Sequence, residues 1–88
     1  MDIFIGTKKS IANYVVAASR FLQKERKIAL RARGRAITRA VDVAEIVRRE
    51  LVKNAKVKSI TLGSDLVEDP KTHRERHIST ITIVLAIE

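Results

Sequence analysis

The chain has 88 residues, of which 45% are hydrophobic, with no cysteine and a net charge of +8. This length supports one hydrophobic core, so we predict a single domain over residues 1–88, and the absence of cysteine excludes disulfides, thiolate metal sites and a thiol nucleophile. No apolar run reaches the ~20 residues that span a bilayer, and the first residues lack the pattern of a signal peptide, which predicts a cytoplasmic location without a membrane partner.

The first elements predicted in chain order are a strand and a helix. Ile3-Phe4-Ile5 is continuously apolar and is followed by Gly6, a pattern typical of a short, buried central strand. Apolar residues then recur at helical spacing, which predicts an amphipathic helix from about Ser10 to Leu22. The polar stretch over residues 23–27 is expected to connect this helix to the next strand.

Residues 28–35 alternate with a period of two, which predicts a half-buried strand. Small and aliphatic side chains would face the core, and Arg31, Arg33 and Arg35 would share the opposite face. Gly34 would then let the chain turn directly into a helix.

The rest of the chain predicts a long helix and a β-hairpin. Helical spacing returns over residues 36–53, and Asn54, which tolerates left-handed backbone, is expected to end the helix. Two β-branched segments, 57–67 and 78–87, predict strands joined by a turn at residues 68–71, which contain the proline. The order βαβαββ predicts an α/β fold of the two-layer α+β type, a mixed four-stranded sheet with two helices on one face.

Positive charge is concentrated in part of the chain. Residues 1–53 hold 13 Lys+Arg against 5 Asp+Glu, whereas residues 54–88 hold 5 of each. Within this basic part, the segment 31–39 has four arginines and no acid, with Arg39 one helical turn beyond Arg35. We interpret the segment as a surface for nucleic-acid phosphates, because a merely solvated strand face would carry more compensating acidic residues.

Lys8 and Lys9 lie just before the first predicted helix. Cations there oppose the helix dipole, whereas the free N–H groups of a first turn attract anions. The pair is therefore a second candidate phosphate site, and the alternative of two ordinary surface lysines stays open.

Other chemistry has less support in the sequence. Phe4, Tyr14 and Phe21 are the only aromatic residues, and each occurs in an apolar pattern, so we expect no exposed platform for base stacking and favour duplexes or structured RNA. His73 and His77 have no third ligand nearby, so no metal site is expected. No arrangement of nucleophile and base supports catalysis, so we expect neither an enzyme nor a cofactor.

Several motifs of the chain form a recognisable set, namely Ile5-Gly6, Lys8-Lys9, Asn13-Tyr14-Val15, Arg31-Ala32-Arg33-Gly34-Arg35-Ala36-Ile37, Ala40-Val41-Asp42, Glu45-Ile46-Val47-Arg48 and Ile78-Ser79-Thr80-Ile81. This set resembles the Alba family of archaeal chromatin proteins, which has eukaryotic relatives in RNA–protein complexes. The resemblance implies the βαβαββ fold, a dimer, and DNA contacts by Lys8 and Lys9 beside Arg33 and Arg35, with either lysine an acetylation candidate. It also adds further candidate nucleic-acid-binding residues, Asn13, Arg74 and Arg76.

The chain departs from the family pattern at three places. Thr7 separates Gly6 from the two lysines. Ser10 occupies the position of the usual proline, and its side chain can cap the helix instead. The hairpin segment 65–77 carries four acids and three bases, so we expect it to contribute less to phosphate affinity than the arginine segment.

We therefore expect a sequence-independent double-stranded DNA-binding chromatin protein that also binds RNA and is associated with the chromosome. Two alternatives stay open, an RNA-dedicated protein of a ribonuclease P-like or ribosomal assembly and a basic adaptor for an acidic protein. We expect a homodimer, or a heterodimer with a paralogue, because surplus apolar residues should remain exposed on a monomer. These residues are Val43, Ile46, Val84 and Ala86.

Overall fold

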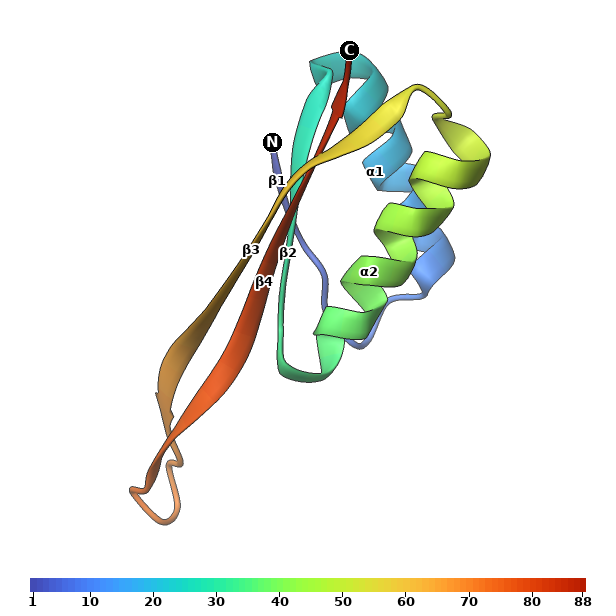
Figure 1. Ribbon diagram of the computed structural model, residues 1–88. Coiled ribbons are helices and arrows are strands. Elements are labelled where there is room, and N and C mark those ends of the chain that lie inside the picture. The colour runs from blue at the N-terminus through green and yellow to red at the C-terminus, as the bar shows by residue number, and fades with distance from the viewer.

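The computed structural model describes residues 1–88 as one four-stranded sheet and two helices (Figure 1). The elements are β1 (Asp2–Phe4), α1 (Ile11–Glu25), β2 (Lys27–Arg33), α2 (Ile37–Ile46), β3 (Ala55–Glu68) and β4 (Glu75–Ile87). The strand order is β1-β2-β4-β3, with β1 parallel to β2 and the other pairs antiparallel. Both helices cover the same face of this mixed sheet, which confirms the predicted architecture. Neither helix has the length and the apolar character that crossing a bilayer requires.

The first strand lies at the edge of the sheet, and the prediction of a central strand was wrong. β1 has β2 as its only neighbour, because β4 occupies the other side of β2. Ile5 is buried at 4% exposure, whereas Phe4 is 73% exposed. A continuous apolar run therefore does not mean here that both faces of the strand are covered.

Helix α1 begins at the predicted cap and runs longer than predicted. The Ser10 hydroxyl oxygen accepts a hydrogen bond from the Asn13 N–H at 3.2 Å. Residues 23–25, expected as a connector, continue the helix because Gln, Lys and Glu are good helix formers. Arg26, at φ 66°, ends the helix in the left-handed conformation and donates its N–H to the Leu22 carbonyl.

The strand β2 ends at Arg33, two residues earlier than predicted. Gly34, at φ 56°, starts a 3-10 turn over Gly34–Ala36 that leads into α2. Arg35 therefore lies on this turn rather than beside Arg31 and Arg33 on the strand, because the left-handed glycine interrupts the alternation.

The end of α2 also differs from the prediction. The regular helix gives way to a π turn over Val47–Leu51, in which the Val52 N–H donates to the Val47 carbonyl at 2.7 Å. Val52 adopts an extended φ of −121°, and Asn54 is not left-handed. The helix thus stops through the widened turn and not through a left-handed asparagine.

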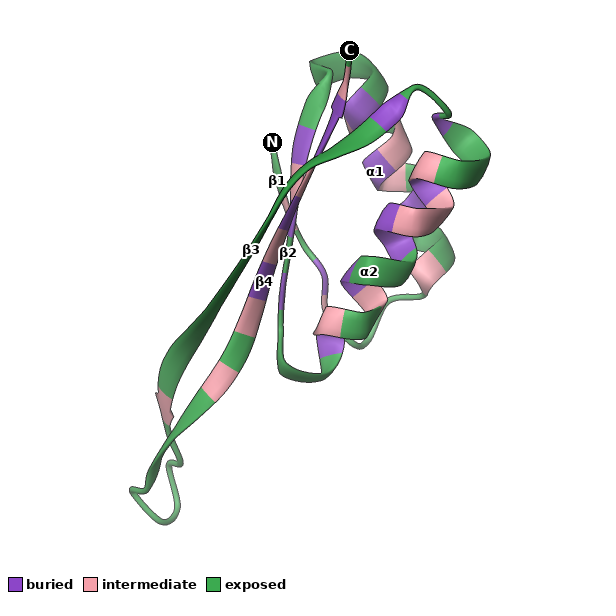
Figure 2. Ribbon diagram, in the orientation of Figure 1, coloured by how far each residue is buried: buried purple, intermediate pink, exposed green.

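The hydrophobic core lies between the sheet and the two helices. It consists of 17 buried residues, Ile5, Val15, Ala18, Leu22, Ile28, Leu30, Ala32, Ala36, Ala40, Val43, Ala44, Val47, Val52, Ala55, Ile81, Ile83 and Leu85. Figure 2 shows that this buried set stops where the β3–β4 hairpin leaves the body. The hairpin projects as an arm, which makes the molecule 47 × 24 × 18 Å.

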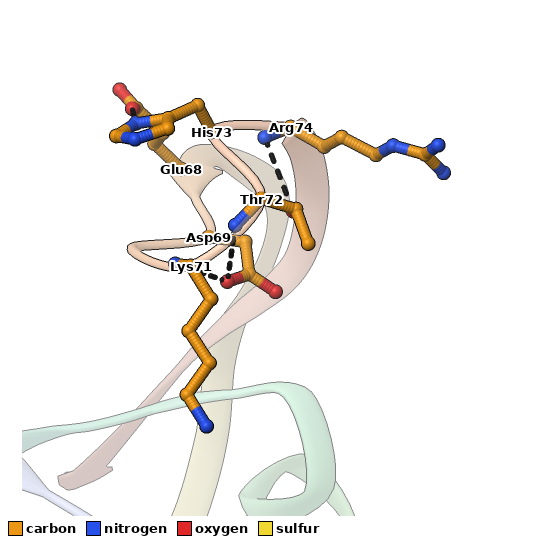
Figure 3. A network of polar contacts seen from close by, with 6 residues as sticks. All are labelled: Glu68, Asp69, Lys71, Thr72, His73 and Arg74. Carbon is orange, nitrogen blue, oxygen red and sulfur yellow. Dashed lines mark hydrogen bonds and ion pairs between the residues drawn. The ribbon is translucent and has the colours of Figure 1, made fainter.

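The strands of the arm are longer than predicted, and its turn lies where it was predicted. Pairing continues to Glu68 opposite Glu75, so the turn covers residues 69–74 and includes Asp69, Pro70 and Lys71 of the predicted turn. At the tip (Figure 3), the Asp69 carboxylate accepts the Lys71 N–H at 2.8 Å and the Asp69 carbonyl accepts the His73 N–H at 2.8 Å. The His73 ring lies 2.9 Å from the Glu68 carboxylate. The acidic residues therefore order the tip.

Candidate nucleic-acid interface

The sheet presents one face to solvent, and the strand register decides which side chains lie on it. We call this the open face. Its central members are Asp2, Phe4, Ala29, Arg31, Arg33, Ser59, Thr61, Gly63, Asp65, Thr80, Thr82 and Val84. The alternation predicted for β2 is confirmed at residues 27–33, where exposed and less exposed residues alternate.

Arg31 and Arg33 project from the open face and meet carboxylates on other strands. The Arg31 Nε lies 3.1 Å from the Asp2 carboxylate, and the Arg33 Nη1 lies 4.0 Å from that of Asp65. Both acids are distant along the chain, so the segment 31–39 carries no acidic residue although its arginines are paired in the fold. Exposed ion pairs of this kind contribute about 0–1 kcal/mol, so phosphates can compete for these guanidinium groups.

Lys8 and Lys9 lie exposed on the loop between β1 and α1, as predicted. Asn13 is exposed in the first turn of α1, where its backbone N–H is used by the cap. Arg35 is exposed on the turn before α2. Figure 1 shows this turn and the lysine loop at the same end of the body. The structure thus brings the loop cations and Arg35 to one end of the sheet.

Arg39, a predicted nucleic-acid-binding residue, makes contacts within the chain that the sequence did not indicate. Its side chain is half-buried, its Nε donates to the Gly6 carbonyl at 2.8 Å, and its Nη2 donates to the Lys9 carbonyl. The Gly6 N–H donates in turn to the Tyr14 hydroxyl at 2.9 Å. Arg39 therefore directs two of its five N–H donors to the backbone of the lysine loop. Nothing in the local sequence period signals this, because the acceptors are backbone atoms of a distant segment.

Replacing Arg39 separates positioning from charge. Arg39→Ala should lower the free energy of unfolding by about 1–3 kcal/mol, because charge-assisted hydrogen bonds to two carbonyls are lost. Arg39→Lys keeps the charge but cannot donate to both carbonyls with the same fork geometry, so we expect it to weaken duplex binding nearly as much as Arg39→Ala. Urea denaturation and binding titrations measure the two effects. Full affinity in the lysine variant would show that Arg39 acts by charge alone.

The arm carries the remaining candidates away from this cluster. Arg74, just before β4, and Arg76, the second residue of β4, are both exposed on the arm, beyond the body of the molecule. His73 contacts Glu68, and His77 is exposed with Leu66 opposite it in the register. The structure contains no group of three His, Cys, Asp or Glu side chains that could hold a metal ion.

Comparisons with known proteins place the chain in a family. The Alba family model matches residues 1–64. The DNA/RNA-binding protein Alba of Nanoarchaeum equitans is 45% identical over 86 residues, which cover 96% of this chain and 94% of that protein. The DNA/RNA-binding protein Alba 1 of Archaeoglobus fulgidus is 38% identical over 97% of this chain and 93% of its own length.

Solved structures agree with these sequence matches. Alba from Thermoplasma volcanium superposes with a TM-score of 0.87 at 36% identity, covering 98% of this chain and 99% of that one. ALBA1 from Trypanosoma brucei shares the fold, with a TM-score of 0.73 at 22% identity over 98% of this chain and 68% of that one. The resemblance to the Alba family is thereby confirmed, and the chain belongs to that family.

Proposed function

We propose that this protein is a sequence-independent double-stranded DNA-binding chromatin protein that also binds RNA. The observation that carries the proposal is a cluster of exposed cations. Lys8, Lys9 and Arg35 lie at one end of the sheet, and Arg31 and Arg33 lie on its open face. Ammonium and guanidinium groups hold phosphates by charge and by paired hydrogen bonds. The two curated relatives described above are named DNA/RNA-binding proteins, which supports both ligands.

The geometry favours contacts with the backbone of the nucleic acid over reading of bases in a duplex. The five cations of the cluster come from a loop, a strand and a turn, and none of them lies on α1 or α2, the helices that could enter a major groove. Phosphate contacts alone carry no sequence information. We propose further that the protein acts on the chromosome in the cytoplasm, in a binding role with no catalysed reaction.

Salt dependence tests this function. Binding to duplexes of unrelated sequence should weaken steeply and equally as salt rises, because each neutralised phosphate releases counterions. For roughly five to eight phosphates per dimer, the log–log slope should lie between about −4 and −7. Fluorescence anisotropy titrations over about 50 to 300 mM salt measure it. A salt-insensitive affinity, or one duplex bound ~1000-fold tighter than the others, contradicts the proposal.

We also propose that the functional unit is a homodimer, although the residues expected to form its interface were in part the wrong ones. Val43 is buried at 0% and Ala86 at 6% within the single chain, and Ile46 packs against the core. Val84 is half-buried on the open face. The long helix buries a wider stripe than its spacing indicated, because α2 packs against both α1 and the sheet.

Four of the nine exposed large apolar side chains lie on one face of a single strand. The helix-side face of β3 carries an apolar row of Val57, Ile60, Leu62 and Leu66. We call this the β3 apolar row. In the register, Ile60 and Leu62 lie directly beside the buried Ile83 and Ile81. The row is therefore a continuation of the hydrophobic core past the edge of the helices.

A second copy of the chain is the occupant that we propose for the β3 apolar row. Leu62 is 76% exposed, Ile60 and Leu66 are each 58% exposed, and Val41 of α2 adds a further apolar side chain at 41%. A surface of this kind on a single strand at the sheet edge is a liability unless it is covered. A two-fold dimer covers two such rows with one self-complementary contact.

A further inference from the structure

Phe4 is the aromatic residue whose environment the sequence pattern described wrongly. Its side chain is 73% exposed and lies on the open face, in register with Arg31. Single exposed apolar residues are common on protein surfaces and need no explanation by themselves. The surroundings of Phe4 indicate a binding site, because they combine cations, a hollow and a backbone fixed by hydrogen bonds.

A hollow of about 550 Å³ lies next to Phe4, where the open face meets the loop between β1 and α1. Phe4 and Tyr14 line it together with Arg31, Arg33, Thr80 and Asp65. Gly63 lies opposite Thr80, and a Cβ there would come within 2.9 Å of the threonine hydroxyl. The volume falls in the range of ~300–1,000 Å³ that small-ligand sites occupy.

Backbone and side-chain hydrogen bonds hold the residues that line this hollow in place. The Ile5 N–H donates to the Arg31 carbonyl at 2.8 Å, which fixes the strand on both sides of the ring. The Arg31 guanidinium is held by Asp2 at 3.1 Å and donates to the Thr82 hydroxyl at 3.4 Å. The ring and the guanidinium group therefore lie on neighbouring strands, ~4.8 Å apart at the backbone, before any ligand arrives.

The chemistry of the hollow fits an unpaired nucleobase better than a phosphate. An exposed ring gives any base a face for stacking, and flanking arginines neutralise the phosphates on either side of that base. Asp65 would repel a phosphate but accepts hydrogen bonds from a base amino group. A duplex cannot use the site, because its bases are already stacked and paired.

We propose that Phe4 and the hollow beside it form a stacking site for one unpaired base of single-stranded nucleic acid, with Arg31 and Arg33 holding the adjacent phosphates. The inference rests on the proposed function and deepens it by assigning a ligand class, single strands, to one part of the surface. RNA and DNA supply the same stacking face and the same phosphates, so both are arms of the test.

The test uses the full-length chain and single-stranded RNA and DNA of about ten nucleotides, within the site sizes of single-strand binders. Phe4→Ala should weaken binding of either single strand about tenfold, as expected for one lost stacking contact, and should leave duplex binding unchanged. Leu51→Ala is the matched control, since it also removes an exposed apolar side chain, 50% exposed, far from the hollow. Thermal unfolding of both variants shows that the fold is retained.

A tryptophan provides a direct readout of stacking. The chain contains no Trp, so Phe4→Trp introduces a single reporter. Its fluorescence should be quenched by a normal single strand and should change little with an abasic strand of the same length, which has the phosphates but no bases. Phe4→Trp should bind single strands at least as tightly as the unaltered protein.

The outcomes separate this inference from the function on which it rests. If no nucleic acid binds even at low salt, the proposed function fails and the stacking site fails with it. If duplex and single strands bind but Phe4→Ala weakens neither, or weakens both equally, the stacking site alone is overturned. Equal quenching by normal and abasic strands overturns it as well.

Discussion

The Lys8→Glu, Lys9→Glu variant is expected to bind duplex DNA on the order of 100-fold more weakly than the unaltered protein at low salt. The change replaces two attractive charges with two repulsive ones in each protomer, on a loop that Arg39 and Tyr14 hold in place. Anisotropy titrations measure the affinity, and the salt slope should flatten because fewer counterions are released. Both lysines are exposed, so the free energy of unfolding should change by less than about 0.5 kcal/mol.

The matched control is Lys24→Glu, Lys27→Glu, which makes the same change of charge at the other end of α1, where both lysines are also exposed. A loss as large as that of the loop variant would mean that net charge, and not the loop, sets the affinity. Normal binding by the loop variant would mean that the inserted Thr7 has turned the lysines away from DNA. Acetylation of Lys8 or Lys9, which we propose as a regulatory step, should weaken binding in the same direction by removing charge.

Features that depend on local spacing were predicted correctly. The alternation that put Arg31 and Arg33 on one face, the Ser10 cap and the apolar stripe with Ala18 and Leu22 are all present. Each of them follows from a period of two or 3.6 residues, or from a side chain that bonds to a backbone group three residues away. Local periods therefore indicate which elements form and which side of each element is apolar.

Features that depend on the neighbours of an element were predicted less well. Phe4 is exposed because its side chain lies on the face of the sheet that no helix covers, and Arg39 is half-buried because its acceptors belong to the Gly6 and Lys9 backbone. Val43 is buried because α2 meets α1 as well as the sheet. None of these contacts is encoded in the spacing of one segment, since each joins residues that are far apart along the chain. The same limitation hid the β3 apolar row, which is visible only once the strand order is known.

Leu62→Asp is expected to convert the dimer to a monomer, raising the dimer dissociation constant by about 100-fold or more. Leu62 is the most exposed member of the β3 apolar row, at 76%, and in the proposed dimer its side chain is buried against a second copy. The variant loses this burial and places a carboxylate in an apolar contact, and each change costs on the order of 1–3 kcal/mol. Sedimentation at micromolar concentration measures the result. Duplex binding should weaken in parallel, since a monomer offers half the cations.

Thr61→Asp is the control that separates the position of the added charge from the charge itself. Thr61 is also exposed and is the residue before Leu62 on β3, but its side chain lies on the open face. Adding the same charge on the same strand should leave the protein dimeric if the helix-side face of β3 is the interface. A dimer lost in both variants would mean that charge on the arm disrupts the hairpin itself, and a dimer kept in Leu62→Asp would move the interface elsewhere. Leu62→Asp should therefore lose duplex affinity. Stacking of a single strand at Phe4 needs only one chain, so single strands should still quench the tryptophan fluorescence of a Phe4→Trp, Leu62→Asp double variant.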